Sequence, residues 1–141
     1  MRKSNDLDVE ATMVDRGSAI RIAGWALTAL VGWFMITDLL PDLEQAAWAV
    51  KANAGLGIPA NVVLWIGISG AAATLLYLMP WTAPLGAILL TGFLGGAVMT
   101  HVRVNGLAWD IGENVLIGVV AWLGLWLRDP RLRRLLPARL A

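Results

Sequence analysis

Residues 52–100 read ANAGLGIPANVVLWIGISGAAATLLYLMPWTAPLGAILLTGFLGGAVMT and contain no Lys, Arg, Asp, Glu or His. About 20 apolar residues are enough for a helix to cross the hydrocarbon of a bilayer. The segment PWTAP at 80–84 interrupts the stretch, because its two prolines remove backbone donors and break a helix. The stretch therefore predicts two membrane spans joined by a tight hairpin.

The rest of the chain has the same character, since 58% of its 141 residues are hydrophobic and 15% are charged. A soluble domain of this size needs more polar groups to cover its surface. We therefore predict an all-α fold, a polytopic membrane four-helix bundle. Its expected segments are a polar tail at 1–21, spans at about 22–40, 58–79, 82–100 and 111–127, and a basic tail at 128–141.

The basic residues are distributed unevenly between the two sides of the predicted bundle. An even number of spans places both termini on one side. Of the 11 Lys and Arg residues, all except Lys51 and Arg103 fall on that side. Segments rich in Lys and Arg stay in the cytoplasm, so we predict that both termini are cytoplasmic. Residues 1–21 lack the apolar core of a secretory signal and are interpreted as a cytoplasmic tail.

The C-terminal tail is basic and interleaved with leucine. We expect Arg128, Arg131, Arg133 and Arg134 to lie on the membrane surface, against anionic headgroups. Each nearby cation gains about 1 kcal/mol there. The alternative is a docking site for an acidic partner.

Small residues recur at four-residue spacing within the predicted spans. They include Gly24 and Gly32 in the first span, and Gly92 and Gly96, with Gly95 beside them, in the third. In lipid, such rows let helix backbones approach closely and pack. We expect packing within the bundle. The alternative is an oligomer contact through Gly92 and Gly96.

Five ionisable residues lie at the ends of spans, all at the predicted non-cytoplasmic end: Asp38, His101, Arg103, Asp110 and Glu113. Such groups in a membrane protein are candidate functional residues. One interpretation is an interfacial salt bridge between Arg103 and Glu113. The other is an acid/base or ligand-binding pair of His101 and Glu113, because histidine changes charge near neutral pH. His101 and Arg103 can face one pocket only if their helix ends near Thr100.

Missing residue types exclude several chemistries. The chain has no Cys and one His, so it holds no disulfide, thiol redox centre, Cys-bound zinc or iron–sulfur cluster. One His among scattered carboxylates gives no metal-ligand spacing, so we predict no metal. No G-x-S-x-G motif, P-loop or dinucleotide fingerprint is present. We expect no nucleic-acid partner, because the basic tail is short and faces the membrane.

One stretch resembles a known family. Residues 84–103, PLGAILLTGFLGGAVMTHVR, closely resemble the central motif of the DoxX-like family of small bacterial membrane proteins. Supporting stretches are LGIP at 56–59, LYLMP at 76–80 and WLGLWLRDPRLR at 122–133. The resemblance implies a four-helix bundle in the bacterial cytoplasmic (inner) membrane.

The resemblance also bears on the site. His101 and Arg103 match the Thr-His-x-Arg element of the family. The residues themselves identify no cofactor. The family takes its name from a subunit of a thiosulfate:quinone oxidoreductase, so the resemblance alone implies a quinone. This chain departs from many relatives at Gly70, where they carry a glutamate, and at Trp81, where they often carry a basic residue. The missing glutamate weakens any proton-coupled mechanism taken from relatives.

Three functions follow from these observations. We favour a non-catalytic membrane subunit or accessory protein of a redox or respiratory-type complex, because no complete catalytic constellation is present. The alternative is a protein or enzyme that binds a quinone-like or lipid-like molecule through an outward-facing site of His101, Arg103 and Glu113. A proton-coupled small transporter fits less well, since it needs a carboxylate deep in a span and Asp38 lies near the end of one.

Overall fold

The computed structural model describes residues 2–135, and the side chains of residues 17–134. Within this part of the chain, every regular element is an α-helix. The helices are α1 (Arg2–Leu43), α2 (Ala47–Gly55), α3 (Ala60–Leu78), α4 (Ala83–Arg103), α5 (Ala108–Arg128) and α6 (Pro130–Leu135).

Among the described residues, four helical segments are long and apolar enough to cross a membrane: Gly17–Leu43 within α1, and the whole of α3, α4 and α5. At 1.5 Å per residue, a helix of 21 residues such as α4 is about 31 Å long, which matches the hydrocarbon thickness of a bilayer. The predicted all-α, four-span architecture is confirmed.

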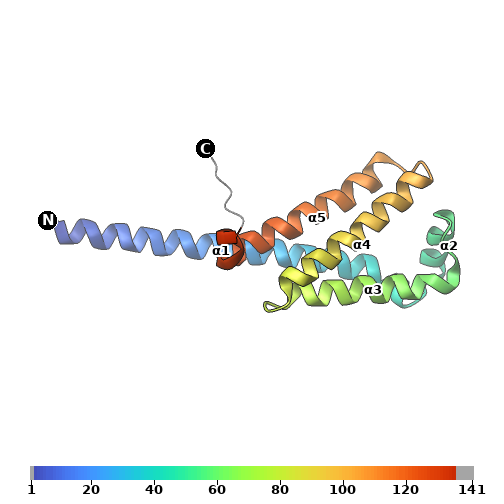
Figure 1. The fold of residues 1–141 in the computed structure, drawn as a ribbon, viewed down its shortest axis with the longest axis horizontal. Coiled ribbons are helices and arrows are strands. Elements are labelled where there is room, and N and C mark those ends of the chain that lie inside the picture. Colours follow the sequence, from blue (N-terminus) through green and yellow to red (C-terminus); the bar gives the residue numbers. More distant parts are fainter. Residues whose placement is uncertain (1, 136–141) are drawn as a thin grey trace.

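The four spanning helices form a closed ring, in which α1 packs on α3, α3 on α4, α4 on α5, and α5 on α1. Short α2 packs on α3 and α1 at one end of the ring. The beginning of α1 and helix α6 lie toward the other end (Figure 1). We call these the loop end and the terminal end.

The structure adds three features to the predicted segments. The polar residues expected as a separate tail continue the first span, because α1 is one helix from Arg2 to Leu43 that projects beyond the bundle (Figure 1). The connection between the first two spans contains α2, a helix that the sequence did not predict. Part of the basic tail folds as α6, and residues 136–141 lie outside the described residues.

The core follows one face of each spanning helix. On α4 the buried residues Ala83, Ala87, Leu90 and Leu94 recur at helical spacing, and each is at most 4% exposed. They pack with residues of α1, α3 and α5, among which Met35 and Tyr77 are fully buried. The buried hydroxyls of Thr28 and Thr74 donate within their own helices, to the Gly24 carbonyl at 2.9 Å and to the Gly70 carbonyl at 2.8 Å.

The glycine rows occupy two different environments. A Cβ atom on Gly24 would lie 2.6 Å from the backbone nitrogen of Arg128, and one on Gly32 would lie 3.0 Å from Leu78. These two glycines therefore allow close helix contacts. By contrast, a Cβ atom on Gly92, Gly95 or Gly96 would meet nothing within 4 Å. The expectation that this second row packs inside the bundle is wrong for the described structure, because these positions face open space.

Arg128 is more buried than the other arginine side chains of the predicted basic tail that the structure describes. This residue is 6% exposed, and its guanidinium group lies over the Trp25 ring, with its carbon 4.6 Å from the ring centroid. Its side chain is therefore packed among the helices at the end of α5. In α6, Arg131 and Arg134 are exposed and Arg133 is half-buried.

Candidate ligand cavity at the loop end

A cavity of about 670 Å³ lies at the loop end, between the α1–α2–α3 side of the bundle and the α4–α5 hairpin. The hairpin diverges from α1 toward this end (Figure 1). On α4, Gly96 and Ala97 face the cavity, so the wall there carries almost no side chain. The divergence and the small residues together leave the space unfilled.

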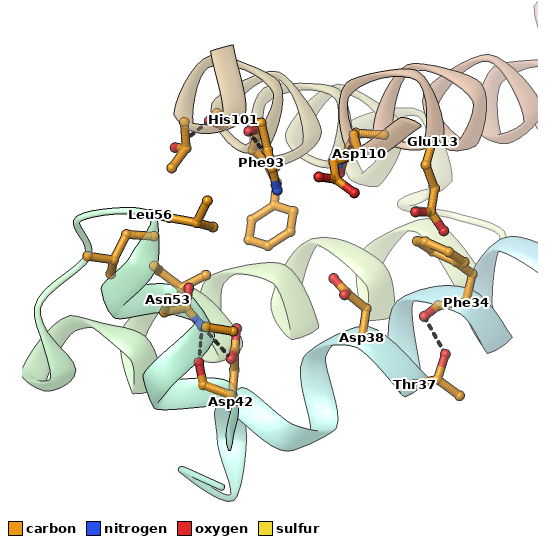
Figure 2. A pocket seen from close by; sticks show the side chains of 18 of the residues that line it. Phe34, Thr37, Asp38, Asp42, Asn53, Leu56, Phe93, His101, Asp110 and Glu113 are labelled. Carbon is orange, nitrogen blue, oxygen red and sulfur yellow. Dashed lines mark hydrogen bonds between the residues drawn. The ribbon is translucent and has the colours of Figure 1, made fainter. Parts of the chain in front are cut away.

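Two helices bring carboxylates to this cavity from opposite sides. Asp38 and Asp42 come from α1, and Asp110 and Glu113 come from α5. Figure 2 shows the α1 pair on one wall and the α5 pair on the other. Among the described residues that line the cavity there is no Lys or Arg. The amide of Asn53, which donates to Asp42, offsets part of the repulsion between these like charges, and solvent, bound protons or a cation can offset the rest.

His101 is the one histidine of the chain, and it lines the same cavity from α4. Its Nδ1 atom lies 2.9 Å from the carbonyl oxygen of Ala97, one turn earlier. Because a carbonyl only accepts hydrogen bonds, Nδ1 carries the proton and donates. When the ring is neutral, Nε2 then keeps a lone pair as an acceptor.

Arg103 does not join this group. Helix α4 continues through Arg103, so the two residues His101 and Arg103 point to different sides of one helix. The Nη2 atom of Arg103 donates to the carbonyl oxygen of Leu56 at 2.6 Å. The interpretation that Arg103 forms a salt bridge with Glu113 is wrong for the described structure. Arg103 instead ties the α2–α3 connection to the end of α4.

A second contact holds α2 over the cavity. The Nδ2 atom of Asn53 donates to the Oδ1 atom of Asp42 at 2.9 Å and to the carbonyl of Ala49 at 3.0 Å. Ala49 is 3% exposed, which shows that this face of α2 is packed against the bundle. Thus α2 is a fixed wall of the cavity.

The remaining lining is mainly apolar. Phe34 lies beside Glu113 and Phe93 lies in the middle of the view in Figure 2. Trp48 from α2 and Ile66 from α3 also contribute. The cavity thus combines apolar and aromatic walls with a few acceptor groups, which is the usual composition of a small-molecule site.

Sequence reasoning found part of this set. Of the five predicted ionisable residues, Asp38, His101, Asp110 and Glu113 line the cavity, and Arg103 does not. Sequence reasoning did not predict Asn53, Asn114 and the aromatic side chains as lining residues, and Asp42 was not a candidate. Helical spacing offered a signal for two of them, because Asp42 follows Asp38 by four residues and Asn114 follows Asp110 by four.

The four carboxylates of the cavity wall are not gathered at one point. Within the described part of the chain, no three His, Asp or Glu side chains are arranged so that they could hold one metal ion. The carboxylates are instead spread around a large space. Their arrangement suits a ligand of several atoms that reaches more than one wall.

These features define a multi-pass, all-helical membrane protein with a ligand-sized chamber between its spans. The sequence pattern of the DoxX-like family matches residues 26–124, a range that includes every described residue of the cavity wall. The chain belongs to the DoxX-like family, as its motifs predicted. No protein of curated function and no solved structure matches it significantly.

Proposed function

We propose that this protein binds a small amphiphilic molecule in the loop-end cavity, and that the head of this molecule is cationic or donates hydrogen bonds. The observation that carries the proposal is the cavity of about 670 Å³ with four carboxylates and no Lys or Arg in its described wall. Sites for small molecules typically have volumes of about 300–1,000 Å³.

The wall chemistry selects the ligand. Ionised carboxylates only accept hydrogen bonds, so they favour an ammonium or another donor-rich head. The rings of Phe34, Phe93 and Trp48 favour an apolar body and attract a cation to their faces. A quinone fits this wall less well, because its carbonyl groups also only accept and the carboxylates would face them. We therefore favour a cationic amphiphile over the quinone that the family resemblance implied.

Purified full-length protein and a pair of matched probes test the proposal. Benzyltrimethylammonium carries a positive charge, and neopentylbenzene is its neutral carbon isostere. We expect the cation to bind more tightly, and Glu113→Gln or Asp38→Asn to weaken its binding about tenfold, or 1.4 kcal/mol. Calorimetric titration in mild detergent measures both affinities.

Glu44→Gln is the matched control, because Glu44 is exposed, lies two residues from Asp42 and is not part of the cavity wall. We expect this variant to bind the cation like the parent protein. Equal affinity for the two probes, or equal losses in Glu113→Gln and Glu44→Gln, would contradict the proposal.

A second candidate is the accessory subunit of a redox or respiratory-type complex. One observation favours it: α1 begins at Arg2 and projects beyond the bundle, where a second protein can pack along it (Figure 1). Purification from the native membrane in mild detergent tests it. We expect a near-stoichiometric partner that is lost when residues 2–16 are deleted, and a solitary particle in native mass spectrometry would contradict it.

We further propose that the termini lie in the cytoplasm of a bacterial cell and that the cavity opens on the other side of the inner membrane. The distribution of Lys and Arg supports this orientation. A C-terminal green fluorescent protein should fluoresce, and a C-terminal alkaline phosphatase should be inactive. The reverse pattern would overturn the orientation.

A further inference from the structure

The terminal end of the bundle contains a buried cation, Arg128, that forms no salt bridge among the described residues. Arg128 is the last residue of α5 and is 6% exposed. Its Nη2 atom donates to the carbonyl oxygen of Tyr77 at 2.6 Å. Its guanidinium carbon lies 4.6 Å from the centroid of the Trp25 ring and 5.1 Å from that of Tyr77. These contacts fix the plane of the guanidinium group.

The other terminal nitrogen of this group has no partner. Nη1 of Arg128 is buried and makes no hydrogen bond among the described residues. The neighbouring carboxylate of Asp129 does not bond to Nη1, and its Oδ1 accepts instead from the backbone N–H of Arg131 at 2.8 Å. A buried charged donor without an acceptor is destabilising. The fold therefore holds a fixed, desolvated N–H group that lacks its acceptor.

A second buried donor without a hydrogen-bond partner lies on α6. Nε of Arg133 is also buried without a hydrogen-bond partner. Helix α6 packs on α5, and Leu132, the neighbour of Arg133, packs against the core. Arg131 and Arg134 of the same helix are exposed. Residues 128–134 thus carry four Arg and one Asp, and the two unpartnered donors are on the most buried of the Arg side chains.

We propose that Arg128 and Arg133 bind a phosphate-type oxyanion at the terminal end, and that the phosphate of a phospholipid headgroup supplies it. Guanidinium groups match the oxygens of phosphate in geometry and charge. Arg128 ends a span of membrane length, which places it at the depth of headgroups. The exposed Trp25 ring suits the same depth. This site is separate from the loop-end cavity and does not depend on the function proposed for it.

Native mass spectrometry of the full-length protein tests the site with three probes. These are dioctanoyl phosphatidylglycerol, inorganic phosphate, and dioctanoylglycerol, which has the same tails and no phosphate. We expect saturable binding of the phospholipid and about tenfold weaker binding of dioctanoylglycerol. If inorganic phosphate displaces the phospholipid, the site also binds the free anion. If it does not, the site is specific for the phospholipid headgroup. Equal binding of the two tailed probes would overturn the proposal.

A pair of variants on α6 separates a specific site from general attraction by positive charge. Arg133→Gln and Arg131→Gln each remove one positive charge from the same short helix. We expect Arg133→Gln to weaken phospholipid binding about tenfold, and the exposed Arg131→Gln to change it by less than about twofold. Equal losses in the two variants would overturn the proposal.

Arg128→Lys keeps the charge and removes the planar fork, and we expect it to weaken binding by a similar factor if it folds. Circular dichroism and gel filtration report its folding. If it does not fold, the comparison of Arg133→Gln with Arg131→Gln still decides the question.

Discussion

The phenol hydroxyl of Tyr77 in α3 donates a hydrogen bond of 2.9 Å to the carbonyl oxygen of Ala121 in α5. These two helices are not neighbours in the ring, so the bond crosses the centre of the bundle. The hydroxyl also lies 3.5 Å from Oγ1 of Thr28 in α1. One fully buried side chain therefore links three of the four spans.

Removal of this hydroxyl should loosen the bundle without leaving a cavity. We expect Tyr77→Phe to lower the free energy of unfolding by about 0.5–1.5 kcal/mol, with the lower end favoured because hydrogen bonds in membrane proteins average about 0.6 kcal/mol. Titration of the purified protein from mild detergent into dodecyl sulfate, followed by circular dichroism, measures the change. The control is Ser69→Ala, since the exposed Ser69 hydroxyl bonds within its own helix. A Tyr77→Phe protein as stable as the parent would contradict the role assigned to the bond.

Two glycines of α4 should respond in opposite ways to alanine. A Cβ atom at Gly86 would overlap the backbone of Leu76 and Tyr77, so Gly86→Ala forces α3 and α4 apart. We expect it to cost at least about 2 kcal/mol of stability. At Gly92 a Cβ atom meets nothing within 4 Å, so Gly92→Ala should be neutral or stabilise the helix by up to about 1 kcal/mol. The same unfolding titration compares them, and equal destabilisation would mean that Gly92 is in contact with another surface.

The contact between Arg103 and Leu56 should restrain the connection between α2 and α3. We expect Arg103→Gln to speed hydrogen exchange at residues 56–58 about fivefold, because one charged hydrogen bond of 2.6 Å is lost. Hydrogen-exchange mass spectrometry measures this rate. Lys51→Gln is the control, since Lys51 is also basic and lies exposed at the same end of the bundle. Unchanged exchange in Arg103→Gln would show that the contact does not hold the connection.

A larger side chain on the small-residue wall of α4 should block the cavity without changing its charge. Gly96 lines the cavity and has nothing within 4 Å of a Cβ position. We expect Gly96→Leu to weaken binding of benzyltrimethylammonium at least about tenfold while the protein stays folded. Gly92→Leu adds the same side chain one turn away, at a position outside the cavity wall, and should bind as the parent does. Calorimetric titration decides, and full affinity in Gly96→Leu would place the ligand elsewhere.

Four spans, their approximate bounds and the hairpin at Pro80 and Pro84 could all be predicted from the sequence. They depend on local properties: apolar residues must leave water wherever the helix lies, and proline breaks a helix through its own ring. The family followed from the motif that ends at Arg103. The position of the carboxylates and His101 at one end of the bundle could also be predicted, because the length and direction of each span fix where its helix ends.

Which way each helix face turns was decided only by the tertiary structure. Gly24 and Gly92 belong to similar small-residue rows, yet one lies at a helix contact and the other faces open space. His101 and Arg103 are two residues apart, yet one lines the cavity and the other binds the Leu56 carbonyl. Helix rotation and tilt depend on how whole surfaces pack together, because lipid gives apolar faces no preferred partner. The sequence alone therefore determined the spans and their ends, while the packed bundle determined the cavity and the buried Arg128.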